Sequence, residues 1–161
     1  ERVLDRVTDR YARENQPALL QHTSELFARV TEGRHLRVVV QPETRTLATV
    51  DRNGQLRSPA DLSSGTREQL FLALRLAYIL DYCDRSEPLP VIMDDVLVNF
   101  DDTRAAASLA ALRDAARHTQ VILLTCHRRE VDLTRSVAPE ARIVELPRES
   151  PPGRLPRPAE A

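Results

Sequence analysis

The chain of 161 residues contains no lysine, and all 23 of its basic residues are arginine. The phosphate-binding loop G-x-x-x-x-G-K-[ST] needs a lysine, so this chain cannot carry that loop. No apolar run approaches the roughly 18 residues of a membrane span, and no signal peptide is evident. We therefore expect no membrane partner.

The chain also has few cysteines and a small net charge. The two cysteines, Cys83 and Cys126, lie far apart and match no metal-binding spacing, so we expect free thiols in an intracellular, cytoplasmic protein. A formal net charge of -1 gives no bulk attraction to nucleic acid or anionic membrane. Hydrophobic residues make up 42% of the chain, enough for one domain with a core. Because the sequence begins at Glu1 without a methionine, we expect a piece of a longer protein.

Two helices are predicted at the N-terminal end. Residues 1–14 carry only a thin apolar seam at helical spacing, which favours a solvated helix and is compatible with the end of a coiled coil. Pro17 suits the first turn of a second helix that runs to about Glu32, and Gly33 is a good stop. The expected buried stripe of this second helix is Leu19, Leu20, Leu26, Phe27 and Val30.

A β-hairpin follows, and then an alternation of helices and strands. Leu36–Gln41 and Arg45–Asp51 are rich in β-branched residues, and Asn53-Gly54 is a strong turn pair. Further on, we expect helices at Thr66–Tyr82, Thr103–His118 and Arg129–Ser136, and strands at Leu89–Met93, Gln120–Thr125 and Ala141–Leu146. This alternation predicts an α/β fold with a parallel sheet.

Burial is expected to be extensive in this second part. The strands Pro90–Met93 and Val121–Leu124 are nearly all apolar, which is typical of strands covered on both faces. The helix Thr66–Tyr82 is apolar enough that we expect it to be buried nearly all round. Five prolines from Pro147 onward predict a disordered tail over residues 147–161.

Leu62-Ser63-Ser64-Gly65-Thr66 precedes the long apolar helix. Ser63 and Ser64 can cap its N-terminus, and Gly65 allows a ligand to approach the backbone. Free N–H groups and the helix dipole then form an anion site. The alternative is an ordinary capped helix without a ligand.

Chemically active residues also follow two of the predicted strands. Asp94 and Asp95 end one strand and His127 follows another, and ligands of open α/β sheets bind beyond the carboxyl ends of strands. Asp94 is placed to coordinate Mg²⁺, and Asp95 to orient or deprotonate a water molecule. The alternatives are that the two carboxylates only begin a loop and that His127 is structural. Asp101, Asp102 or Thr103 can cap the next helix. The other histidines, His22, His35 and His118, are expected at the surface or at helix ends.

Along the chain, a serine-glycine helix start, a strand that ends in Asp-Asp and a strand followed by histidine occur in the same order as in the C-terminal lobe of the ABC-type ATPases, which this chain resembles. Leu62–Thr66 is similar to the LSGGQ signature, with Ser64 for the first glycine and Thr66 for the glutamine. Asp94 matches the Walker B aspartate, Asp101 the D-loop aspartate and His127 the switch histidine. The resemblance spans about residues 17–146 and is strongest to YhaN-type proteins, bacterial relatives of the SMC and DNA-break-repair ATPases.

The resemblance implies an α/β, parallel-sheet P-loop NTPase half-domain with a β-hairpin. Residues 1–16 would be the end of a returning coiled-coil helix. ATP and Mg²⁺ would be the cofactors. The partners would be an N-terminal Walker A half, a second head bound across ATP, and DNA in repair or chromosome maintenance. The implied site residues are Asp95 and His127 for catalysis, Asp94 for the metal, and Ser63, Ser64, Gly65, Thr66, Asn99 and Asp101 for the nucleotide.

One departure from the family concerns the base. Most members carry glutamate where Asp95 stands, and aspartate is one methylene shorter, so hydrolysis is expected to be slow or to use a second water. Two other hypotheses remain: the C-lobe of a transporter's ATPase subunit, and a non-catalytic dimerisation module. A transporter lobe would continue from a helical subdomain, whereas this chain opens with a charged helix.

Overall fold

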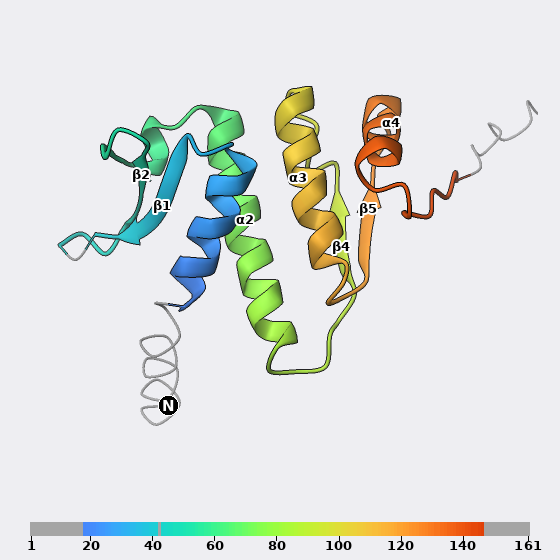
Figure 1. Ribbon diagram of the computed structural model, residues 1–161, viewed down its shortest axis with the longest axis horizontal. Helices are drawn as coiled ribbons and strands as arrows, with labels where there is room; N and C mark the ends of the chain where they lie inside the picture. The colour runs from blue at the N-terminus through green and yellow to red at the C-terminus, as the bar shows by residue number, and fades with distance from the viewer. Residues whose placement is uncertain (1–17, 42, 147–161) are drawn as a thin grey trace, which may run out of the picture.

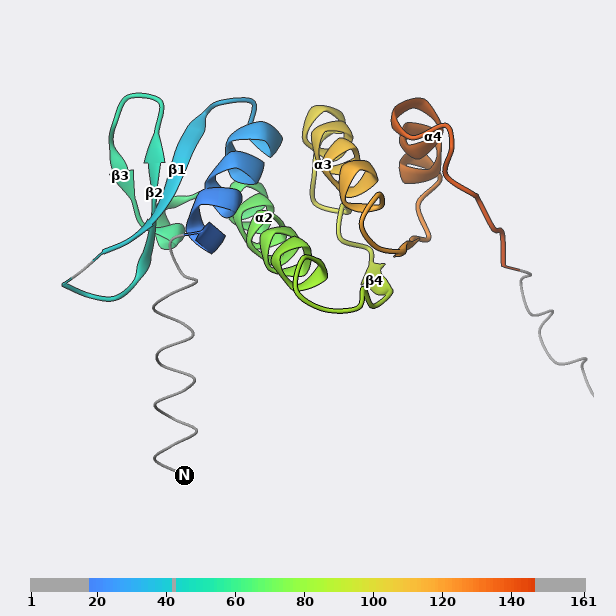
Figure 2. The same cartoon turned by 60° about the horizontal axis from the view of Figure 1, so that its bottom comes forward.

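The computed structural model of the chain describes residues 18–41 and 43–146. The predicted coiled-coil helix of residues 1–16 and the predicted tail of residues 147–161 lie outside this part. No described helix is long and apolar enough to cross a membrane. In Figures 1 and 2, a small antiparallel sheet lies at one end of the molecule, followed by a row of helices and a pair of parallel strands.

Residues 18–30 form the first described helix. Phe27 and Val30 are fully buried, and Leu20 and Leu26 pack against the core, as the apolar stripe predicts. The chain then turns at Gly33, whose φ of 74° is in the left-handed region that favours glycine. This helix therefore ends where the sequence predicts.

The antiparallel sheet has the order β1-β2-β3 and confirms the predicted hairpin. Its strands are β1 (His35–Val40), β2 (Leu47–Asp51) and β3 (Leu56–Arg57). The short β3 was not predicted. It forms because Gly54, with a φ of 76°, reverses the chain and the Asp51 carboxylate accepts hydrogen bonds from the backbone of Asn53 and Gln55, each at 2.9 Å.

A short 3-10 helix, η1 (Pro59–Asp61), leads into the long helix α2 (Ser64–Cys83). One face of α2 is completely buried, with Leu70 and Leu76 in the core. The expectation that α2 is buried all round is wrong, because Phe71, Tyr78 and Tyr82 are exposed, Tyr78 to 60%. No described element covers this second face.

The parallel sheet consists of β4 (Val91–Asp94) and β5 (Val121–Leu124), with Asp94 opposite Leu124. Helices α3 (Asp102–Ala115) and α4 (Arg128–Val137) follow β4 and β5 and pack on each other. Only part of the strand surface is covered. Met93 joins the core, but Ile92 is 66% exposed and Leu124 is 42% exposed, so the expected burial of both faces is wrong.

The predicted third parallel strand at Ala141–Leu146 does not form. Residues 142–146 have no regular structure, and Val144 is 64% exposed. A strand needs a neighbour for its backbone hydrogen bonds, and none of the described strands pairs with this segment. The α/β class is nevertheless confirmed, with one parallel and one antiparallel sheet.

Candidate functional site

The carboxyl ends of β4 and β5 bring the predicted acidic residues and His127 to one edge. The parallel pairing continues past β4, since the Asp95 N–H donates to the Leu124 carbonyl at 3.0 Å. Asp94 is the last residue of β4 and is exposed, and His127 follows β5 as the N-cap of α4. The predicted placement of Asp94, Asp95 and His127 at one sheet edge is therefore confirmed.

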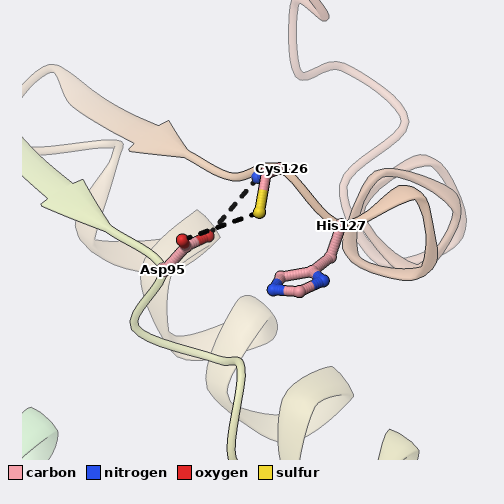
Figure 3. A group of neighbouring side chains, drawn as sticks. All are labelled: Asp95, Cys126 and His127. Carbon is pink, nitrogen blue, oxygen red and sulfur yellow. Dashed lines mark hydrogen bonds between the residues drawn. The ribbon is translucent and has the colours of Figure 1, made fainter.

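Figure 3 shows that the side chains of Asp95, Cys126 and His127 gather at this edge. The Cys126 backbone N–H donates to Asp95 Oδ1 at 3.4 Å, and its thiol lies 3.9 Å from Asp95 Oδ2. One donor atom from each of Asp95, Cys126 and His127 lies within 4.8 Å of the others. The sequence alone indicates no role for Cys126, because 31 positions separate it from Asp95 and only the register of β4 and β5 joins them.

The backbone at Asp95 has a φ of 46°, in the left-handed region. Aspartate and asparagine tolerate this conformation better than most residues, and such conformations concentrate at functional sites. The turn directs the carboxylate toward the loop that follows β5 (Figure 3). Nothing in the sequence pattern signals this backbone conformation.

The predicted signature motif caps and begins α2. Ser63 is the N-cap: its hydroxyl accepts a hydrogen bond from the Thr66 N–H at 3.3 Å and lies 2.8 Å from the Thr66 hydroxyl. Ser64 is the first helical residue, so of the two predicted caps only Ser63 has that role. A Cβ atom added at Gly65 would lie 2.6 Å from Arg104 Nη1 and 3.6 Å from the Asn99 carbonyl oxygen. The start of α2 therefore packs tightly against the loop that follows β4.

That loop also carries the two remaining predicted nucleotide residues. The Asn99 amide donates to Glu68 of α2 at 2.9 Å. Asp101 caps α3 by accepting the Arg104 N–H at 2.8 Å, and its other carboxylate oxygen lies 3.4 Å from Arg104 Nε. The alternative that Asp101 is a helix cap is thus confirmed.

A cavity of about 400 Å³ lies beside the signature motif, between α2 and the antiparallel sheet. Ser63, Thr66 and Arg104 line it on one side. Three further arginines border it, together with two acidic residues: Arg34, Arg52, Arg57, Asp51 and Asp61. Neither Asp94 nor Asp95 lines this cavity, so the signature motif and the edge of the parallel sheet do not share it.

Two groups at this cavity titrate away from their usual values. Hydrogen bonds from the backbone of Gln55 and Asn53, with Arg57 nearby, hold the pKa of Asp51 below its usual value. Burial lowers the pKa of His35, which is half-buried in β1 with its ring centroid 5.1 Å from that of Phe27. The expectation that His35 is a surface or helix-end residue is therefore wrong, because the sheet packs it on the core.

No protein-family model matches the chain. In sequence, the chain is similar to the uncharacterized protein YhaN of Bacillus subtilis strain 168, with 29% identity over 126 residues. The match covers 78% of this chain and 13% of YhaN. The chain thus spans only a small part of this relative.

The solved structures to which this chain is similar include SMC head domains. The head with a coiled coil and joint from Pyrococcus yayanosii has a TM-score of 0.62 at 16% identity, over 82% of this chain and 26% of that one. The Thermotoga maritima head has a TM-score of 0.54 at 17% identity, and the match covers 80% of this chain and 43% of that one. An SMC ATPase described for its ATP-driven dimerization and DNA-stimulated activation has a TM-score of 0.61 at 16% identity. This match covers 78% of this chain and 76% of that one. The chain has the fold of the C-terminal lobe of an SMC-like ATPase head, and its sequence is similar to that of YhaN.

Proposed function

We propose that this chain is the C-terminal half of a split ATP site in an SMC-like head. An N-terminal Walker A lobe would hold the phosphates of ATP, because this chain has no lysine for that purpose. The observation that carries the proposal is the proximity of Asp95 and His127 at the end of the parallel strands, where a carboxylate oxygen and a ring nitrogen lie within 4.8 Å of each other. Residues 17–146 would form the lobe, with residues 1–16 leading from a coiled coil and residues 147–161 as a tail.

Exposed apolar surface supports a missing lobe. Parallel strands are normally covered on both faces, yet Ile92 and Leu124 are exposed, and Leu89 before β4 is exposed as well. In the described chain the parallel sheet has only two strands, so each presents an open edge. An N-terminal lobe that adds strands and covers this face would bury these side chains.

The residues at the strand ends fit Mg²⁺ and ATP. Proteins usually hold Mg²⁺ by one or two carboxylates together with substrate phosphates, and Asp94 is an exposed carboxylate at the required edge. Bound Mg²⁺ would neutralise charge on the transferring phosphoryl group. Asp95 would take the proton of the attacking water, and the Cys126 N–H would hold its carboxylate in place. His127 makes no side-chain capping bond to α4, so its ring is available to contact the phosphate.

The signature motif would act on the nucleotide of a second head. Its helix N-terminus and the groups of Ser63, Ser64, Gly65 and Thr66 would form an anion site. The cavity beside this motif is not lined by Asp94 or Asp95, which fits a nucleotide separate from theirs. Asn99 and Asp101, which tie the loop after β4 to α2 and α3, would border the same nucleotide. Two heads would then dimerise across ATP.

Action on DNA, in repair or chromosome maintenance, belongs to the same proposal. It is supported by the fold of an SMC ATPase that DNA stimulates. The chain itself has a net charge of -1, so DNA contact would depend on the assembled head and coiled coil more than on this lobe. A cytoplasmic location follows from the same proposal.

Two competing functions are weaker. A non-catalytic dimerisation module would not need Asp94, Asp95 and His127 together at one edge. A transporter's ATPase lobe is disfavoured because the described structural relatives are SMC heads.

The test is an ATPase assay on the chain, on an N-terminal lobe with a phosphate-binding loop, and on their mixture. We expect phosphate release only from the mixture, and loss of that release with Asp95→Asn. Turnover by the chain alone would contradict the split site. Absence of turnover in a mixture that forms a stable complex and binds ATP would favour the non-catalytic module.

A further inference from the structure

Three chemically different donors meet at the end of the parallel strands: a carboxylate, a thiol and an imidazole. Asp95, Cys126 and His127 each present one donor atom within 4.8 Å of the other two. Among the described residues, no other group of three histidine, cysteine or acidic side chains gathers in this way. We propose that these three side chains form a binding site for a thiophilic divalent cation of the Zn²⁺ class.

The distances suit a tetrahedral ion. Zn–S bonds of about 2.3 Å and Zn–O bonds of about 2.1 Å put a sulfur and an oxygen ligand about 3.6 Å apart on a tetrahedron. The Asp95 Oδ2 to Cys126 Sγ distance is 3.9 Å, so an ion fits between these atoms with little movement. The side chains of Cys126 and His127 are exposed, so they can rotate by the short distance that brings the His127 ring onto the ion as its third ligand.

The donor set selects against Mg²⁺. Sulfur and imidazole donors favour Zn²⁺ and Co²⁺, whereas Mg²⁺ prefers an octahedron of oxygen atoms. The proposed Mg²⁺ ligand is Asp94, which is not a member of the three-donor group. With three protein ligands, the fourth position stays open to water or to another ligand, and the exposure of the group gives the ion a path from solvent.

Binding follows a simple proton balance. The ion replaces the proton of the Cys126 thiol, one proton leaves to the solvent, and no atom changes its oxidation state. His127 binds as the neutral imidazole and Asp95 as the carboxylate.

Occupancy would block the chemistry proposed for this edge. The ion would engage the carboxylate of Asp95 and the ring of His127, and neither could then serve the attacking water or the phosphate. We therefore expect zinc to inhibit the assembled head. This consequence rests on the proposed ATPase function, whereas binding of the ion does not.

Binding is tested by titrating Co²⁺ into the purified chain and following the cobalt–thiolate charge-transfer absorption, with Zn²⁺ as competitor. Cys126→Ser should remove this absorption and weaken binding at least about tenfold, since even the loss of an outer-shell residue usually costs that much. Cys83→Ser is the matched control, because Cys83 lies in α2 outside the group, and it should leave the titration unchanged. Asp95→Asn and His127→Gln should each weaken binding, with circular dichroism showing that both variants fold.

The binding proposal is overturned if the Cys126→Ser chain keeps the absorption and affinity, or if the parent chain shows no thiolate absorption. Inhibition by Zn²⁺ is tested on the head assembled with its N-terminal lobe. For each variant, the ATPase rate in Zn²⁺ is divided by the ATPase rate of the same variant in a chelator. Cys126→Ser should raise the Zn²⁺ concentration that halves turnover at least about tenfold. If Co²⁺ binds as expected but Zn²⁺ leaves turnover unchanged, the metal site stands and the catalytic roles of Asp95 and His127 are wrong.

Discussion

Replacement of Gly65 by alanine should separate folding of the lobe from its proposed contact with a second head. Gly65 is the second residue of α2 and is buried. An added Cβ would lie 2.6 Å from Arg104 Nη1, too close for both atoms to stay in place. The guanidinium is the end of a flexible side chain, so we expect it to move and the helix to stay.

Two opposing terms set the effect on stability. Alanine is favoured over glycine by about 1 kcal/mol within a helix, and by less in its first turn. Displacement of Arg104 weakens its ion pair with Asp101, whose carboxylate is 61% exposed, and such surface pairs contribute roughly 0–1 kcal/mol. The terms nearly cancel, so the free energy of unfolding should change by less than about 1 kcal/mol.

The dimer should respond much more strongly. In the proposed complex the start of α2 approaches the partner's nucleotide. The added methyl group would push Arg104 toward the cavity beside the signature motif, which Arg104 lines, and the displaced arginine would occupy space that the nucleotide needs. We expect ATP-dependent dimerisation to weaken at least about tenfold, which corresponds to the loss of roughly 1.4 kcal/mol. Urea unfolding measures the first quantity, and analytical ultracentrifugation of the assembled head in MgATP measures the second.

Gly33→Ala is the matched control. Gly33 has a φ of 74° and no atom within 4 Å of an added Cβ, so this variant adds backbone strain without a clash. It should lose about 1–2 kcal/mol of stability and dimerise normally. Parental dimerisation of Gly65→Ala, or a loss of several kcal/mol of its stability, would refute the proposed contact.

The remaining predictions concern acidic residues. Asp95→Asn should retain ATP and the backbone conformation, lower turnover by about 10²- to 10⁴-fold and accumulate as an ATP-bound dimer; a parental single-turnover rate would mean that the base lies elsewhere. Asp95→Glu should speed turnover if reach limits catalysis, while the left-handed backbone costs about 1 kcal/mol in urea unfolding; a slower head would show that aspartate already reaches the water. Asp94→Asn should raise the Mg²⁺ concentration needed for ATP binding, and an unchanged Mg²⁺ titration would exclude it as the ligand. The folded-state pKa of Asp51 is lowered, so its contribution to stability is complete above the ordinary aspartate pKa of about 3.9 and is lost as the pH falls through the folded value. Thermal unfolding from neutral to strongly acidic pH should therefore be less pH-dependent in Asp51→Asn, and an equal slope would refute this assignment.

The sequence predicts well those features that depend on neighbours along the chain. The hairpin of β1 and β2, the turn at Gly33 and the cap at Ser63 all follow from local backbone chemistry. The shared edge of Asp94, Asp95 and His127 was also predictable, because parallel strands place their carboxyl ends together.

Features that depend on distant packing were not predictable in the same way. The exposed face of α2 and the absent strand at 141–146 share one cause, since no described element covers or pairs with them. The meeting of Cys126 with Asp95 depends on strand register and on a left-handed residue, and spacing along the sequence reports neither. A search for metal ligands by spacing alone therefore misses this group.

The central claim, that this chain holds one half of an ATP site, is tested most directly by calorimetric titration of MgATP. The chain alone should give no binding heat at micromolar concentrations, because it has no lysine-bearing phosphate loop. The chain mixed with an N-terminal lobe that carries such a loop should bind ATP. Tight binding of ATP by the isolated chain would contradict the split-site account.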